Sequence, residues 1–170
     1  VPTSSVALGA NLVPVDLGVH HHADLWLTYH KEFRNSDRHK IVIDWLKKTL
    51  RPGGMWNEER VIIFTEYRAT QKWLFDLLAR EDFAADGRLE MIYGGMPNDQ
   101  REPIKAAFQT HPNESAVRIL LATDAASEGV NLQNHCSKLI HFEIPWNPNR
   151  MEQRNGRVDR HGQKADEVHI

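Results

Sequence analysis

Short apolar runs alternate with longer amphipathic runs through most of this chain, and the alternation leaves few folds open to it. Strands are predicted at four apolar runs, 61–64, 89–93, 117–121 and 139–142. Helices are predicted from apolar residues at helical spacing, at 37–50, around 73–78, at 99–108 and at 150–159. Strands that alternate with helices in this way indicate a parallel sheet covered by helices on both faces. The predicted fold class is therefore α/β.

Two of the predicted helices carry features that the structure can test directly. Trp73, Leu74, Leu77 and Leu78 are expected to form the buried stripe of one helix. Pro103 lies inside the 99–108 run, where a proline removes a backbone hydrogen bond, so that helix is expected to start late or to kink.

Ligands of such sheets bind beyond the carboxyl ends of the strands. The loops after Phe64, Tyr93, Leu121 and Phe142 are therefore expected to carry the functional residues.

Length and composition indicate one domain with an attached arm. The chain has 170 residues, and its 21 Lys and Arg nearly balance its 23 Asp and Glu, so no overall charge favours nucleic acid. One cysteine and the lack of a long apolar run or signal peptide predict a cytoplasmic protein. Residues 1–35 are expected to be an arm or linker, with residues 25–27 available to dock it. Residues 36–170 are expected to be the domain, truncated at its C-terminal end because residues 168–170 resemble the start of a strand.

Positive charges cluster in residues 153–160, which read Gln-Arg-Asn-Gly-Arg-Val-Asp-Arg. If the helix continues through them, Gln153, Arg157 and Arg160 share one narrow face and Arg154 flanks it. Like charges there repel one another, and a bound phosphate would relieve the repulsion. The alternative is a solvated basic face without a ligand.

This segment resembles motif VI of superfamily 2 helicases. The resemblance implies that Arg157 and Arg160 are arginine fingers, and that Gln153 and Arg154 contact ATP bound on a partner lobe. A loose transition state at the γ-phosphate needs planar, permanently protonated donors that are held in place beforehand.

Residues 122–133 read Ala-Thr-Asp-Ala-Ala-Ser-Glu-Gly-Val-Asn-Leu-Gln and resemble motif V of the same superfamily. The resemblance implies that Thr123 binds a nucleic-acid phosphate and that Gly129 and Asn131 lie near the nucleotide. The alternative is a turn after a strand, capped by Thr123 or Asp124 without any ligand.

Residues 61–67 and 93–108 resemble motif IV and the segment that follows it. The resemblance implies that Thr65 and Gly94 also contact the nucleic-acid backbone. The alternatives are an ordinary strand end at Thr65 and a tight turn at Gly94.

Two further runs narrow the resemblance to the Swi/Snf-type group of duplex-DNA translocases. Residues 145–148 read Pro-Trp-Asn-Pro, and residues 159–163 read Asp-Arg-His-Gly-Gln. Residues 127–129, which read Ser-Glu-Gly, and residues 156–160, which read Gly-Arg-Val-Asp-Arg, are most similar to the bacterial branch, including the RNA-polymerase-associated ATPases. Residues 124–127 read Asp-Ala-Ala-Ser where eukaryotic remodellers carry Arg-Ala-Gly-Gly, which weighs against a chromatin function. The expected partners are duplex DNA, a first RecA-like lobe of the same protein, and RNA polymerase or another DNA-bound complex.

No Walker A sequence, Gly-x-x-x-x-Gly-Lys-Ser/Thr, occurs in the chain. The resemblance therefore implies a second RecA-like lobe, with ATP and Mg²⁺ held mainly by the first lobe, and an isolated chain without activity. No metal site is expected, because His20, His21 and His22 lack ligand spacing. Two alternatives stay open: a non-catalytic RecA-like module that binds nucleic acid or protein, and a helicase that separates strands.

Overall fold

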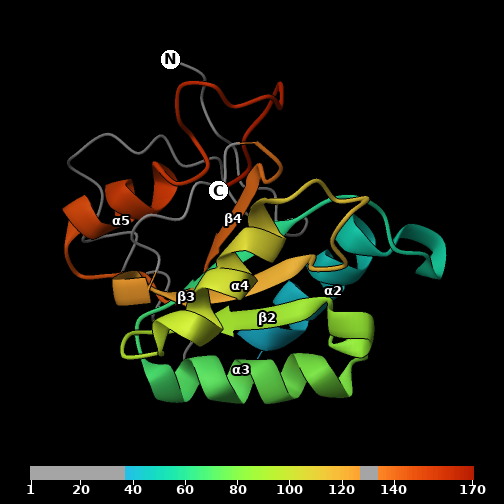
Figure 1. The fold of residues 1–170 in the computed structure, drawn as a ribbon. Helices are drawn as coiled ribbons and strands as arrows, with labels where there is room; N and C mark the ends of the chain where they lie inside the picture. Colours follow the sequence, from blue (N-terminus) through green and yellow to red (C-terminus); the bar gives the residue numbers. More distant parts are fainter. Residues whose placement is uncertain (1–36, 127–133) are drawn as a thin grey trace.

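A computed structural model describes residues 37–126 and 134–170. Its centre is a parallel sheet of four strands in the order β2-β3-β1-β4 (Figure 1). The strands are β1 (Val61–Thr65), β2 (Leu89–Ile92), β3 (Ile119–Thr123) and β4 (Lys138–His141). The helices are α2 (Arg38–Leu50), α3 (Arg68–Arg80), α4 (Asn98–Gln109) and α5 (Pro148–Asn155). The α/β prediction of a parallel sheet is confirmed.

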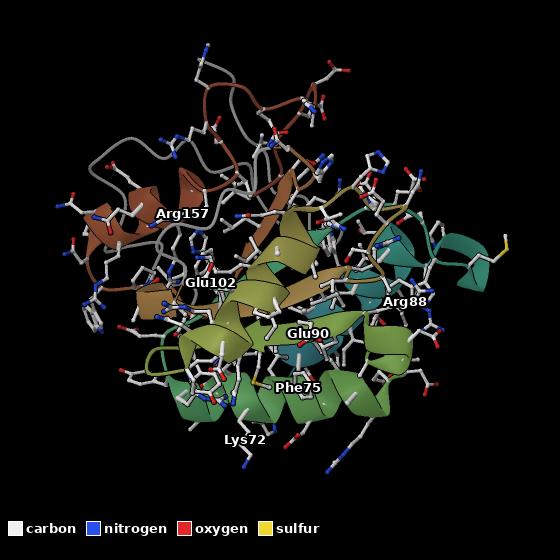
Figure 2. The ribbon with its side chains drawn as sticks, viewed as in Figure 1. Lys72, Phe75, Arg88, Glu90, Glu102 and Arg157 are labelled. Atoms are coloured by element: carbon white, nitrogen blue, oxygen red, sulfur yellow. The ribbon has the colours of Figure 1, made fainter. Side chains whose placement is uncertain are left out.

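Helices cover both faces of the sheet because successive strand residues point to opposite faces. Val61 and Ile63 of β1 belong to a core shared with α2 and α3. Ile62 and Phe64 belong to a second core, which includes Phe108 of α4. Helix α3 has one face on the sheet and one face in solvent: Figure 2 shows that Phe75 points toward the sheet and Lys72 points away from it.

Several predicted boundaries and contacts were wrong. The third strand begins at Ile119 rather than residue 117, and α4 begins at Asn98 although it contains Pro103, so its late start was wrong. The carbonyl of Pro97 accepts the amides of residues 100 and 101, at 3.1 and 3.0 Å, which starts the helix before Pro103. Trp73 is 48% exposed and lies at the edge of the core, against His39 and Phe142.

The end of the chain makes one isolated bridge to β4. Lys138 and His169 form a parallel bridge, in which Leu139 N–H donates to the His169 carbonyl at 2.9 Å. Val168 and Ile170 pack against the second core. One isolated bridge at His169 does not make a strand, so the strand expected to begin at residue 168 stays a prediction. No helix among the described residues is long and apolar enough to cross a bilayer.

A fully buried arginine lies at the amino edge of the sheet. Arg60, directly before β1, donates hydrogen bonds to the carbonyls of Val117 (3.0 Å), Phe108 (2.6 Å), Ala107 (3.5 Å) and Thr110. Three of these carbonyls belong to the C-terminal end of α4, where a helix leaves acceptors unpaired and carries partial negative charge. Burial, followed by the nearby Arg118, lowers the pKa of Arg60 to about 10, so the guanidinium stays charged at neutral pH.

Candidate functional site

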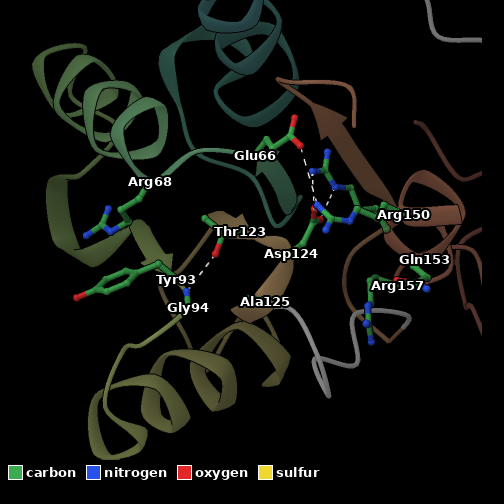
Figure 3. A pocket seen from close by; sticks show the side chains of 11 residues that line it. Glu66, Arg68, Tyr93, Gly94, Thr123, Asp124, Ala125, Arg150, Gln153 and Arg157 are labelled. Atoms are coloured by element: carbon green, nitrogen blue, oxygen red, sulfur yellow. Dashed lines mark hydrogen bonds and ion pairs between the residues drawn. The ribbon is translucent and has the colours of Figure 1, made fainter. Parts of the chain in front are cut away.

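A cavity of about 480 Å³ opens at the carboxyl edge of the sheet. Its lining comes from the loops after β1, β2 and β3 and from α5 with the turn that follows it (Figure 3). The lining residues are Glu66, Arg68, Tyr93, Gly94, Thr123, Asp124, Ala125, Arg150, Gln153, Arg154 and Arg157. Three of the four loops that were expected to carry functional residues therefore line this cavity, and their function stays a prediction.

Charge in the cavity favours an anion. Four arginines line it against two carboxylates, those of Glu66 and Asp124. Arg150 lies 4.0 Å from the Glu66 carboxylate and 3.9 Å from the Asp124 carboxylate. Because the Arg150 side chain is exposed, these ion pairs contribute little to stability. The surplus of guanidinium groups over carboxylates suits phosphate oxygens, which guanidinium groups bind in a bidentate manner.

Arg154 is the best-anchored arginine of the lining. It is 2% exposed, and its Nε and Nη2 donate to the two carboxylate oxygens of Asp124 at 2.5 and 2.9 Å. Its Nη1 donates to the Glu143 carbonyl at 2.8 Å, and the guanidinium lies 5.2 Å from the Phe64 ring centre. Most of its donors are therefore used within the protein. Arg154 fixes α5 to the end of β3, and a nucleotide contact from it stays a prediction.

His141 completes this buried network in its neutral form. Arg154 Nη1 lies 3.4 Å from His141 Nδ1, and His141 Nε2 lies 2.7 Å from Asn155 Oδ1. Because arginine cannot accept a hydrogen bond, Nδ1 is the acceptor and Nε2 carries the proton. Burial lowers the pKa of His141 to about 4; Asn155 and Asp124 oppose the shift and the Arg154 charge adds to it.

This depressed pKa predicts that acid destabilises the domain. Between pH 6.5 and about 4, the unfolded chain binds a proton at His141 that the folded chain does not bind. The contribution of neutral His141 to the free energy of unfolding is therefore complete above pH 6.5. As pH falls toward 4, the free energy of unfolding decreases by up to about 3 kcal/mol. Urea unfolding of the chain at several pH values measures this dependence. His141→Gln keeps an acceptor for Arg154 and a donor for Asn155, so its free energy of unfolding should fall less with acid. Equal pH dependence in both proteins would contradict the assignment.

The residues predicted to bind nucleic acid lie together on one side of the cavity. Gly94 N–H donates to Thr123 Oγ1 at 3.2 Å, and the Arg68 guanidinium lies 3.7 Å from the centre of the Tyr93 ring (Figure 3). A Cβ at Gly94 would come within 3.1 Å of the Ala125 Cβ, so a larger residue would crowd this turn.

Thr65, the third predicted contact, is fully buried at the end of β1 beside Thr123. Its Oγ1 has no hydrogen-bond partner among the described residues. Direct contact with a phosphate from this hydroxyl would require local rearrangement, and its role stays a prediction.

The predicted continuous helical face of residues 153–160 was wrong. α5 ends at Asn155, and the chain continues in turns in which Arg157 N–H donates to the Arg154 carbonyl at 3.0 Å. The physical reason is Val158, which is fully buried in the second core and draws the chain back to the sheet. Gln163 donates to the Val158 carbonyl at 2.7 Å and stabilises the turn.

The two predicted fingers consequently occupy different environments. Arg157 lines the cavity, and its Nε is buried without a hydrogen-bond partner among the described residues. Figure 2 shows Arg157 beside α5. Arg160 is exposed and does not line the cavity, whereas Gln153 does. Gly129 and Asn131 lie outside the described residues.

Sequence reasoning missed Glu66, Arg68 and Arg150 as parts of the site. A signal for the first two was present, because they follow directly after β1 in a loop that was expected to be functional. Arg150 lies one helical turn before Arg154 and could have been found from that spacing. No group of three or more potential metal ligands occurs among residues 37–126 and 134–170.

Comparison with known proteins gives relatives that are much longer than this chain. An uncharacterized ATP-dependent helicase, YqhH of Bacillus subtilis, is 38% identical over 129 residues, which are 76% of this chain and 20% of YqhH. The RNA polymerase-associated protein RapA of Vibrio vulnificus is 30% identical over 129 residues, 75% of this chain and 12% of RapA. The chain thus spans about a fifth or less of the length of these relatives.

Two solved structures share the fold. The C-terminal part of the Fun30 ATPase domain matches with a TM-score of 0.61 and 22% identity, over 82% of this chain and 41% of that one. Domain 2 of the DEAD-box helicase Mss116p, bound to an RNA duplex, matches with a TM-score of 0.63 and 18% identity, over 78% and 48%.

The sequence profile of the helicase conserved C-terminal domain matches residues 41–162. The chain therefore belongs to the helicase conserved C-terminal domain family, and it has the RecA-like fold of a helicase lobe.

Proposed function

We propose that this chain is the second motor lobe of an ATP-dependent nucleic-acid translocase that moves on duplex DNA. The observation that carries the proposal is a single cation-rich cavity, with the predicted nucleic-acid contacts Gly94 and Thr123 on one side and Arg157 on the other. The first RecA-like lobe of the same protein supplies the Walker motifs that this sequence lacks.

The nucleotide side of the cavity fits a phosphate. The unpaired, buried Nε of Arg157 is a charged donor whose hydrogen-bonding capacity is unused within the described residues. Arg157 and Arg160 act as arginine fingers, Gln153 supports them from α5, and Gly129 and Asn131 contribute from the motif V segment. Mg²⁺-bound ATP supplies the phosphoryl group and the metal charge. The chain's own residues supply fixed positive charge for the transition state.

The nucleic-acid side holds the sugar-phosphate backbone rather than the bases. The Gly94 turn allows close approach, and Arg68, stacked on Tyr93, presents a guanidinium at the same edge. Such contacts give binding that depends on salt and hardly on sequence. RNA polymerase or another DNA-bound complex is the proposed partner, on the strength of the similarity to RapA.

The test is ATP hydrolysis by the protein that carries this domain together with its first lobe. We expect duplex DNA to stimulate hydrolysis more than single-stranded DNA or RNA does, and we expect the DNA affinity to fall linearly with salt on logarithmic axes. Stimulation by RNA alone would contradict the duplex-DNA track. Nucleic-acid binding without any stimulated hydrolysis would instead indicate the non-catalytic module.

A further inference from the structure

Helix α3 begins without a cap of its own. Tyr67 occupies the N-cap position without a side-chain hydrogen bond, and the first turn contains no acidic residue. The missing acceptor comes from Glu143, in the loop between β4 and α5. Its Oε2 accepts from the backbone N–H groups of Glu66 (2.8 Å) and Tyr67 (3.2 Å), and its Oε1 accepts from the Thr70 hydroxyl at 2.9 Å. A carboxylate in this position also complements the positive end of the helix dipole.

The backbone of the same residue holds α5. The Glu143 carbonyl accepts from Arg154 Nη1 at 2.8 Å, and Arg154 forms the bidentate pair with Asp124. Glu143 therefore bonds to the turn after β1 through its side chain and to α5 through its main chain.

These two attachments serve different parts of the cavity lining, the start of α3 and α5 with the turn that follows it. Arg68, in the first turn of α3, forms one wall and lies across the cavity from Gln153 and Arg157, which form the other (Figure 3). Glu66 lies between these walls, beside Arg150. Glu143 itself does not line the cavity. Arg150 reaches Glu66 only at 4.0 Å in an exposed position, so this direct contact is too weak to fix the spacing of the walls.

We propose that Glu143 is a positioning residue that sets the distance between the nucleic-acid side and the nucleotide side of the cavity. The inference rests on the proposed function. By anchoring α5 to the start of α3, Glu143 holds Arg157 in the geometry in which it reaches the phosphate when the two lobes close. A displacement of about 1 Å in such a group lowers a rate by about a hundredfold.

The first experiment measures kcat and KM for ATP in the two-lobe protein with saturating duplex DNA. We expect Glu143→Ala to lower kcat by about tenfold to a hundredfold, with little change in the KM for ATP. Glu143→Gln keeps an acceptor for the two amides and can donate to Thr70, so it should recover most of the rate. Glu152→Ala, at an exposed position on α5, is the matched control and should hydrolyse ATP at the wild-type rate. A purely structural role would lower the melting temperature of Glu143→Ala but leave kcat per folded molecule unchanged, which would overturn the inference.

A second measurement does not depend on activity. Amide hydrogen exchange in the 170-residue chain should become faster in Glu143→Ala both at the turn of residues 66–67 and along α5. Faster exchange at the turn alone would show that the walls are not linked and would overturn the inference. A wild-type protein without stimulated hydrolysis would overturn the proposed function, and the exchange result would then still decide whether Glu143 links the two walls.

Discussion

Replacing Arg157 by alanine in the two-lobe protein is expected to lower ATP turnover by about 10³ to 10⁵ while ATP binding is nearly spared. The reason is that a finger stabilises charge that develops only in the transition state, so its loss appears in kcat rather than in affinity. Arg157 fits this role because its buried Nε has no hydrogen-bond partner among the described residues and lies at the cavity. Single-turnover hydrolysis and equilibrium nucleotide binding measure the two quantities separately.

Arg160→Ala is expected to have the same effect, since Arg160 is proposed as the second finger. Its exposure here fits a side chain that finds its partner only on the other lobe. Arg157→Lys should recover little, because a lysine ammonium cannot form the bidentate contact. Arg80→Ala, at an exposed position on α3, is the control. Normal turnover in both alanine variants at 157 and 160 would refute the finger assignment.

The largest effect on stability is expected at the opposite edge of the sheet. Arg60→Ala should lower the free energy of unfolding by about 3 to 5 kcal/mol, because it leaves several buried carbonyls without donors. Such a loss is a large part of the total stability of a domain. Arg60 is fully buried and donates hydrogen bonds to the carbonyls of Val117, Ala107 and Phe108. Its guanidinium carbon also lies 5.5 Å from the centre of the Phe108 ring.

Urea unfolding of the chain measures this loss, with Arg80→Ala as the matched exposed change, expected to stay within about 0.5 kcal/mol. Arg60→Lys should recover only part of the stability, because three donors on a flexible stem replace five donors in a planar fork. A loss below about 1 kcal/mol in Arg60→Ala would contradict a structural role for these bonds.

The fold was predictable because buried parallel strands appear in the sequence as continuous apolar runs. Val61–Thr65 is buried at every position, and its run was unambiguous. Boundaries were less predictable where a tertiary contact decides them. Val158 ends the helical continuation of α5 by entering the core, and nothing in the local sequence distinguishes it from a surface valine.

Residues of the candidate site could be predicted where they belong to a sequence motif. The prediction was incomplete where two interacting residues lie far apart in the sequence. The sequence identified Gly94, Thr123 and Arg157, and the structure brings all three to one cavity. It did not distinguish Arg154, which is buried and whose partner Asp124 lies 30 positions away, from the other arginines that line the cavity. Glu143 gave no signal, because it caps a helix 76 positions earlier in the chain.

The strand order has a consequence for how the chain is made. Because β3 lies between β1 and β2, the first two strands never pair with each other, and β1 has no partner until residue 119 has been synthesised. At ribosomal rates this interval is on the order of 3 to 10 s. Throughout this interval β1, one of the two interior strands of the finished sheet, is an unpaired apolar segment without charge or proline, which is the composition of an aggregation-prone sequence. Co-translational folding of this domain therefore depends on how well the nascent chain is shielded while β3 is being made.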